Sequence, residues 1–359
     1  MIKFIFVWIL FCLFSFSQQD LNLTLYNYSF WNPVRAWIQH LGFYQRPLTM
    51  GIYLLLIGLS FWLYFKLLKR GFSRKWLILL VFLALPAYPL FSYDIFNYLF
   101  NAKMVIIYHV NPHIQTAIQF AGDPLLRFMH NVHTPAPYAY GWTGLSLLPG
   151  LVWFSKNFTL SFWAMKLFIA GFWLGQLWIL KKLVRRLFPQ QQWRFWLFAL
   201  NPLVLVETLI NGHNDVVMMF LALVGYWFFL NSKKFRSLLF LLFSASIKYV
   251  TIILLPLFSL RGDSLQAKKI DLPTLFSVAL LLVMLIRPGQ LHSWYLIWAF
   301  SFVVLSRSAW LIKVFTALTF GALLRYAPYL YYGHWDPPVY LLRNLIWALS
   351  LFLAPLVKI

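Results

Sequence analysis

Acidic residues and cysteine are scarce in this sequence. Of its 359 residues only eight are Asp or Glu, against 30 Lys and Arg, and 11% are charged. The single cysteine, Cys12, forms no internal disulfide and no cysteine-based metal site, so cysteine usage says nothing about the redox compartment. So little charge beside 62% hydrophobic residues excludes a soluble globular protein.

Motifs that would identify other enzyme classes are also absent. There is no GxGxxG, Walker A or GxSxG element, which removes nucleotide-driven and α/β-hydrolase functions. His109, His113, His130 and His133 form no HExxH motif, which gives a zinc site little support. We therefore expect no cofactor and no metal site.

Apolar runs recur along the whole chain, each long enough or nearly long enough to cross the hydrocarbon core of a bilayer. The pattern predicts an all-α polytopic membrane protein. A net charge of +22 could indicate a nucleic-acid partner, but most basic residues occupy short segments between apolar runs. The positive-inside rule predicts that distribution, so we expect membrane lipids as partners and no nucleic acid.

The apolar runs predict about ten transmembrane helices, with both chain ends inside. The first run, residues 4–16, is interpreted as an uncleaved anchor, with a cleaved signal peptide as the alternative. The other expected spans lie near residues 50–68, 76–91, 162–180, 193–210, 216–230, 272–286, 295–305, 310–325 and 339–357.

Two further apolar segments are interrupted and are predicted to be re-entrant. Residues 142–155 contain Pro149-Gly150 and are short, so they are expected to enter the membrane partway. Residues 237–260 carry Lys248 at the centre and are expected to form a hairpin of two half-helices. A charged residue at that depth is costly unless it is paired or hydrated, so Lys248 should face a polar cavity.

Asp94 opens the segment 93–141, which is predicted to be a large extracytoplasmic loop. At helical spacing Asn97 and Tyr98 share a face with Asp94, and apolar residues take the opposite face. An amphipathic helix that begins where a span ends should lie in the headgroup plane, with its polar side toward water. The alternative is an Asp94 that is simply a solvated loop residue or a helix cap.

The sequence Asn-Gly-His-Asn-Asp at 211–215 joins two expected spans. His213 is a candidate for binding a phosphate or a sugar hydroxyl, and Asp215 for binding a sugar hydroxyl or orienting His213. The alternative is a turn in which Asp215 caps the next helix. Glu207, the only glutamate, lies about one turn below and is expected to form a structural ion pair with Lys248 or Arg287.

The segment 287–295 closes another expected span on the same outer side. Arg287 and His292 are donors suited to a phosphate, and Trp294 and Tyr295 are candidates for stacking on a sugar ring. Headgroup contact for Arg287 and a place in the interfacial aromatic belt for Trp294 are the alternatives.

These motifs occur together in a particular order. Asp94 after a span is followed by GDPLL at 122–126, TPAPY at 134–138, NPLVLVETLINGHND at 201–215 and HSWYLIWAF at 292–300. This order resembles the GT-C class of polytopic glycosyltransferases, which use polyprenyl-phosphate sugars as donors. The similarity is greatest to the actinobacterial-type α-(1→6)-mannosyltransferases.

The resemblance implies a GT-C-like bundle forming a single transmembrane glycosyltransferase domain over 1–359, with Asp94 as catalytic base. It also implies a polyprenyl-phosphate donor that carries a hexose, expected to be mannose. The implied acceptor is a glycan or glycolipid at the extracytoplasmic face of the cell membrane. A phosphate leaving group needs no general acid, only one base and cations. The candidate phosphate ligands are His213, Arg287, His292 and Lys248. The candidate sugar and acceptor ligands are Asn97, Tyr98, Asn211, Asn214, Asp215, Tyr138, Trp294 and Tyr295.

Two other functions fit parts of the same pattern. Broken helices and a buried lysine are also typical of transporters, so a flippase for lipid-linked sugars is the main alternative. A non-catalytic assembly subunit that retains the fold is the other.

Overall fold

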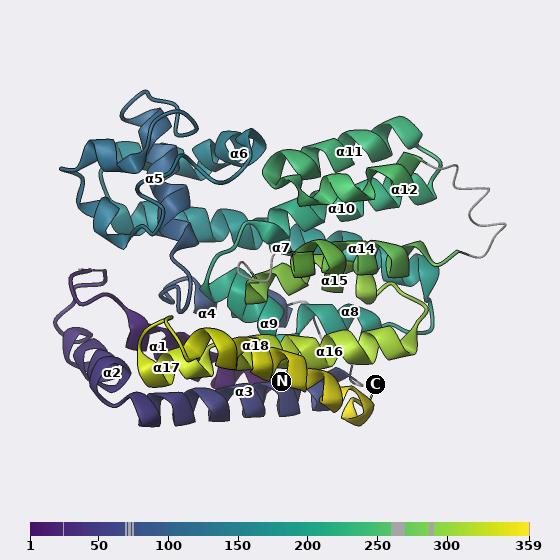
Figure 1. The fold of residues 1–359 in the computed structure, drawn as a ribbon, viewed down its shortest axis with the longest axis horizontal. Helices are drawn as coiled ribbons and strands as arrows, with labels where there is room; N and C mark the ends of the chain where they lie inside the picture. Colours follow the sequence, from purple (N-terminus) through teal and green to yellow (C-terminus); the bar gives the residue numbers. More distant parts are fainter. Residues whose placement is uncertain are drawn as a thin grey trace.

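The computed structural model describes residues 1–23, 25–68, 70, 73, 75–259, 270–286 and 291–358, and no β-strand occurs among them (Figure 1). The α-helices are α1 (Ile2–Phe14), α2 (Asn32–Tyr44), α3 (Arg46–Leu68), α4 (Lys75–Ala84), α5 (Asp94–Ile106), α6 (Tyr140–Gly150), α7 (Phe158–Leu187), α8 (Trp193–Ala199), α9 (Pro202–Leu205), α10 (Asp215–Leu230), α11 (Lys234–Ile247), α12 (Leu255–Ser259), α14 (Leu272–Ile286), α15 (Leu296–Val303), α16 (Ala309–Leu324), α17 (Ala327–Tyr332) and α18 (Val339–Leu349). Short 3₁₀ or π-helical turns are η1 (Ser15–Gln18), η2 (Ala117–Phe120), η3 (Pro124–Phe128), η4 (Leu151–Ser155), η5 (Val206–Ile210), η6 (Tyr249–Leu254), η8 (Ser293–Tyr295) and η9 (Ser350–Leu356).

Four helical stretches among the described residues are long and apolar enough to cross a membrane. They are Arg46–Leu68, Phe158–Leu187, Ala309–Tyr332 and Val339–Leu356, with 23, 30, 24 and 18 residues. At about 1.5 Å per residue these lengths suit a hydrocarbon core of about 30 Å. The prediction of an all-α membrane protein is confirmed. The count of about ten crossings stays a prediction, because the other apolar helices are shorter.

The expected span 193–210 is broken. Trp193–Ala199 and Pro202–Ile210 meet at 44°. Pro202 has no N–H to continue the first helix, and the Asn201 side chain caps the second by accepting from the Leu203 N–H at 3.0 Å. The break redirects the chain so that the second helix delivers residues 211–215 to one end of the bundle.

The expected span 76–91 is helical only to Ala84. The ammonium of Lys166 on α7 donates to the carbonyls of Ala84 and Ala87, both at 2.7 Å. The Ala84 carbonyl also accepts the Ala87 N–H at 3.0 Å, and a cation is favourable beside carbonyls at the C-terminal end of a helix. The non-helical segment that follows carries the chain to Asp94.

The predicted hairpin over 237–260 is confirmed in its geometry. α11 ends at Ile247, Lys248 is extended with φ −143° and ψ 130°, and the chain returns through η6 and α12, which pack against α11. Residues 142–155 form α6 and η4 and pack on α5. Gly150 allows that approach, since a Cβ there would lie 2.8 Å from the Ile106 side chain. Whether either element is re-entrant stays a prediction.

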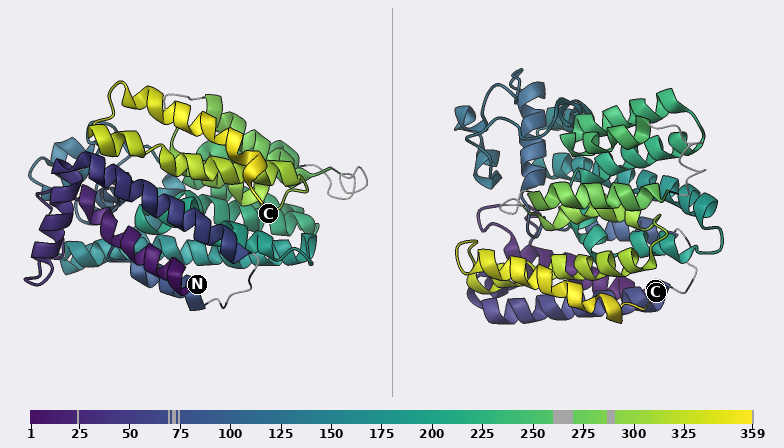
Figure 2. Two further views of the ribbon diagram at one scale, coloured as in Figure 1. Left: turned by 90° about the horizontal axis from the view of Figure 1, so that it is seen from below. Right: turned by 45° about the vertical axis from the view of Figure 1, so that its right-hand side comes forward.

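The helix predicted after Asp94 is present as α5, and it runs across the direction of the long helices at one end of the bundle (Figures 1 and 2). The expectation that its polar side faces water was wrong. Asn97, Tyr98 and Asn101 are buried, as are the apolar residues opposite. The 107–139 segment, α6 and α7 enclose the helix, so its polar face points into protein.

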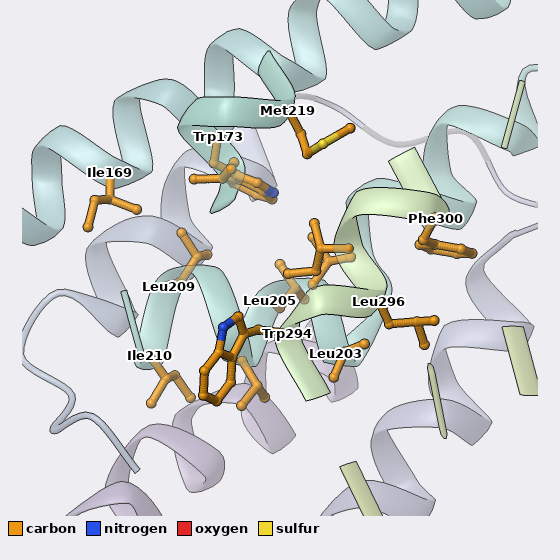
Figure 3. Packing of buried hydrophobic residues seen from close by; sticks show 14 of the residues in the cluster. Ile169, Trp173, Leu203, Leu205, Leu209, Ile210, Met219, Trp294, Leu296 and Phe300 are labelled. Carbon is orange, nitrogen blue, oxygen red and sulfur yellow. The ribbon is translucent and has the colours of Figure 1, made fainter. Parts of the chain in front are cut away.

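One large cluster of buried apolar side chains extends from α1 to α18. Its centre lies around the broken helix 202–210, where α7, α10 and α15 supply side chains to the same packed region (Figure 3). Trp294 belongs to this cluster and also lines the cavity described below. The candidate site therefore stands directly on a close-packed support.

Candidate active site

A cavity of about 610 Å³ opens where α5 begins. That volume is typical of a small-molecule site. Its walls come from Phe91–Asp94, the 130–139 loop, Lys248 and Tyr249, residues 291–295, and a C-terminal group consisting of Arg325, Tyr326, Trp335 and Arg343. These segments are far apart in the sequence, and the bundle brings them together.

Asp94 is the first residue of α5 and the one carboxylate among the described residues that lines this cavity. Its backbone N–H is held by the Ser92 hydroxyl at 3.2 Å, and its side chain is 21% exposed. Burial alone would raise the pKa of Asp94, but His213, Lys248 and His292 outweigh it and lower the pKa to about 2. The carboxylate is therefore fixed, accessible from the cavity, and charged.

His213 lies behind Asp94 between two carboxylates. Its Nδ1 is 3.3 Å from Asp94 Oδ2 and its Nε2 is 3.2 Å from Glu207 Oε2, and its side chain is fully buried. Burial opposes protonation, but the two carboxylates outweigh it and raise the pKa of His213 to about 9. The ring is thus an imidazolium at neutral pH. Sealed in this way, it contacts Asp94 and does not line the cavity.

Glu207 lies in η5, the π-helical turn at 206–210, a distortion frequent at functional sites. It is fully buried, accepts from Asn211 Nδ2 at 2.7 Å and from the Tyr326 hydroxyl at 2.8 Å. The expected pairing with Lys248 was wrong, because His213 takes that place. Arg287, the other expected partner, lies outside the described residues.

The 211–215 turn follows η5, which carries Glu207, and contacts the segment that carries Asp94. Asn211 Oδ1 accepts from the Leu90 N–H at 2.8 Å, and the Asn214 N–H donates to the Tyr98 hydroxyl at 3.3 Å. Gly212 has φ +74°, a left-handed conformation that glycine adopts without strain. The two asparagines and Tyr98 are buried and hold the site in place from behind.

Lys248 lines the cavity and pairs with Asp215, which lies behind the wall. Lys248 Nζ is 2.8 Å from Asp215 Oδ2, and Trp298 Nε1 donates to the other carboxylate oxygen. The ammonium also lies 5.9 Å from the ring centre of Tyr138 and 5.7 Å from that of Tyr295. The prediction that Lys248 faces a polar cavity is confirmed. The suggested orienting of His213 by Asp215 was wrong, since Asp94 and Glu207 flank that ring.

Three aromatic rings are stacked beside Asp94. The Trp294 ring lies 4.0 Å from His213 and 4.3 Å from His292, with interplanar angles of 18° and 15°. Burial, opposed in part by Asp94, lowers the pKa of His292 to about 4, so this imidazole is neutral at neutral pH. Trp294 keeps the charged and the neutral histidine apart.

A comparison with known families decides the identity. Residues 24–261 match the family described as alpha-(1->6)-mannopyranosyltransferase, N-terminal domain. The chain belongs to this family. No curated protein and no solved structure matches it. The expected glycosyltransferase, of the mannosyltransferase type and GT-C class, is thereby confirmed.

The family match covers only part of this mannosyltransferase's cavity. It includes Asp94, the 211–215 turn and Lys248, and it ends before His292. Arg325, Tyr326, Trp335 and Arg343 lie beyond the match and were missed by the sequence reasoning. A usable signal existed for the two arginines, because both stand at the expected outer ends of spans, where the positive-inside rule disfavours basic residues.

The candidate site residues of the mannosyltransferase fall into two groups. Those that line the cavity are Asp94, Tyr138, Lys248, His292, Trp294 and Tyr295. Those placed behind its wall are Asn97, Tyr98, Asn211, His213, Asn214 and Asp215. Arg287 lies outside the described residues. No group of three metal-ligating side chains occurs in the part of the chain that the structure describes.

Proposed function

We propose that this protein is an inverting mannosyltransferase that transfers mannose from a polyprenyl phosphate to an extracytoplasmic glycan or glycolipid. The supporting observation is a single cavity-lining carboxylate, Asp94, among the described residues, surrounded by cationic side chains. This asymmetry fits a donor whose phosphate leaves without protonation. A two-carboxylate hydrolase would place a second carboxyl group in the same cavity.

The proposed reaction is a direct displacement at the anomeric carbon. The acceptor hydroxyl attacks, the bond from that carbon to the phosphate oxygen breaks, and the hydroxyl proton passes to Asp94. The phosphate departs with the electron pair of the broken bond, and cations in the cavity stabilise its charge. Attack from the face opposite the leaving group inverts the centre, so a β-linked donor gives an α-linked product.

His213 and Glu207 act in this scheme as positioning residues for Asp94. An imidazolium 3.3 Å from the carboxylate fixes its orientation, and Glu207 on the far side holds the imidazolium in place. With a pKa near 2, Asp94 is ionised at every physiological pH and always ready to accept a proton. It is a weak base, which suits a reaction in which proton transfer accompanies bond formation rather than preceding it.

We further infer that the whole chain acts as one multi-pass domain of about ten crossings, with this cavity at the extracytoplasmic face. The 233–236 and 261–269 basic segments then lie in the cytoplasm. The polar residues of the cavity stand at helix ends, with Asp94 beginning α5 and Arg325 ending α16. A flippase pathway would instead place them near mid-membrane.

The deciding experiment is transfer of radiolabelled sugar by purified protein. Native membrane lipids and glycans serve as acceptors, and polyprenyl-phosphate mannose is compared in parallel with the glucose and arabinose donors. We expect activity with the mannose donor. Asp94→Asn should abolish transfer while the variant stays folded. Asp336→Asn, whose side chain is 86% exposed, is the control and should retain full activity. Substantial turnover by Asp94→Asn would remove Asp94 from the role of base.

A further inference from the structure

Two arginines stand together in the C-terminal wall of the cavity. Arg325 directly follows α16, and Arg343 is in the first turns of α18. Arg325 Nη2 donates at 2.9 Å to the Asn344 side chain, the residue next to Arg343, and the two guanidinium groups are close enough to repel each other. Both line the cavity that Asp94 lines.

Neither arginine forms an ion pair among the described residues, and Glu207 acts on Arg325 only from beyond ion-pair distance. Among the described residues, no carboxylate lies within ion-pair distance of either guanidinium group. Arg325 is only 3% exposed, and the buried Nε atoms of both arginines have no hydrogen-bond partner. Two adjacent positive charges in a membrane protein are expensive without an anion, and such a pair therefore marks a binding site.

Both guanidinium groups are held in place while donors remain free. The rings of Tyr340 and Trp335 lie 4.7 and 5.6 Å from the Arg343 guanidinium, and the buried Nε of Arg343 has no hydrogen-bond partner among the described residues. Arg325 is anchored at 2.9 Å to the Leu291 carbonyl as well as to Asn344. A fixed guanidinium fork with unused N–H groups matches the oxygens of a phosphate.

The other cations around the cavity are less suited to an anion. Lys248 is paired with Asp215, and His213 is sealed between Asp94 and Glu207. His292 offers a neutral imidazole. The two arginines are therefore the cations of the described cavity wall that have no ion-pair partner.

We propose that Arg325 and Arg343 together form the phosphate-binding site of this cavity, and that the ligand is a phosphate ester carried on a lipid. Its assignment to the donor rests on the proposed function. The same chemistry could instead recognise a phospholipid headgroup, and the experiment has an arm for each source.

The test is equilibrium binding by the full-length protein in phosphatidylcholine nanodiscs, without any sugar transfer. The probes are polyprenyl phosphate, polyprenol of the same length, inorganic phosphate and phosphatidylglycerol. Arg343→Gln is the main variant, because the Arg343 side chain forms no ion pair and its Nε no hydrogen bond among the described residues. Arg343→Lys keeps the charge without the fork, and Arg325→Lys tests the second arginine. Arg307→Gln is the matched control, because Arg307 is exposed and lies two residues before the start of α16, at the end away from Arg325.

Arg343→Gln should bind polyprenyl phosphate about tenfold more weakly or worse, the usual cost of losing a charge-assisted hydrogen bond. Arg343→Lys should be intermediate, Arg307→Gln should match the wild type, and no variant should change the affinity for polyprenol. Inorganic phosphate should compete in the wild type and not in Arg343→Gln. If only phosphatidylglycerol binding depends on Arg343, the phosphate site stands and its assignment to the donor is overturned.

The proposal would be overturned entirely if Arg343→Gln and Arg325→Lys bound every phosphate probe as tightly as the wild type does. Both variants must have wild-type melting temperatures for this comparison. This failure is distinguishable from that of the proposed function. Intact transfer with unchanged phosphate binding in the arginine variants removes only the phosphate site. Transfer that persists in Asp94→Asn removes the catalytic assignment and leaves the binding result in place.

Discussion

The imidazolium between Asp94 and Glu207 predicts an unusual dependence of stability on pH. A histidine whose folded pKa is raised contributes stability that is fully present below its unfolded pKa and is lost as pH rises through its folded pKa. For His213 these limits are 6.5 and about 9. The shift corresponds to a loss on the order of 3 kcal/mol between those pH values. Wild-type protein should therefore become clearly less stable from pH 6.5 to 9.

His213→Gln tests this reasoning. The variant leaves Glu207 with its bonds to Asn211 and Tyr326 but without a cation, so we expect it to be less stable by about 3–5 kcal/mol near pH 6. That deficit should shrink as pH approaches 9, because the wild type loses its own advantage there. The measurement is apparent melting temperature in detergent from pH 6 to 10. His334→Gln, with 45% of its side chain exposed, is the control.

The same variant should change the pH dependence of transfer. In His213→Gln, Asp94 loses a cation that lowers its pKa, so the pKa of Asp94 rises. The fall of kcat/KM at acid pH, which lies below the measurable pH range in the wild type, should then move to a higher pH. A parallel decline in the stability of wild type and His213→Gln between pH 6.5 and 9, with superimposable pH–rate profiles, would show that the imidazolium is not placed as described.

Other consequences can be checked separately. Lys248→Met should destabilise the protein by about 3–5 kcal/mol by leaving Asp215 buried and unpaired, and adding Asp215→Asn should restore much of the loss in thermal unfolding. Gly212→Ala should cost about 1–2 kcal/mol, since alanine is strained at φ +74°, whereas Gly51→Ala, where nothing lies within 4 Å, should be tolerated. A reporter fused after Gly212 should report the outer compartment, and a cytoplasmic signal would contradict the topology.

The sequence was informative where a single segment decides the structure. The helix beginning at Asp94 and the hairpin turning at Lys248 were predicted from local patterns, for which composition and the spacing of apolar residues suffice. The mannosyltransferase family was predicted from the resemblance carried by the order of the motifs. Asp94, Tyr138 and His292 line one cavity, and they were expected on the same side of the membrane, whereas Lys248 was expected at the centre of a membrane segment facing a polar cavity.

Features that depend on packing between distant segments could not be predicted in this way. The enclosure of α5 depends on the 107–139 segment folding over it, which helical periodicity does not reveal. The partner of Glu207 was misjudged because formal charge favoured a lysine or arginine over a histidine. Pro86 in the sequence indicates that α4 ends near Ala84, but the contact of Lys166 on α7 could not be predicted, because Lys166 is 79 and 82 residues away from the carbonyls it binds.

The enclosure of α5 affects how the enzyme senses its surroundings. A helix that carries the proposed base and lies among headgroups would move with them, and its distance from the rest of the cavity would vary with membrane thickness. Here protein surrounds the helix on both faces, and Asp94 is tied to a turn from the other half of the bundle. Turnover should therefore change little when bilayers of different acyl-chain length surround the protein.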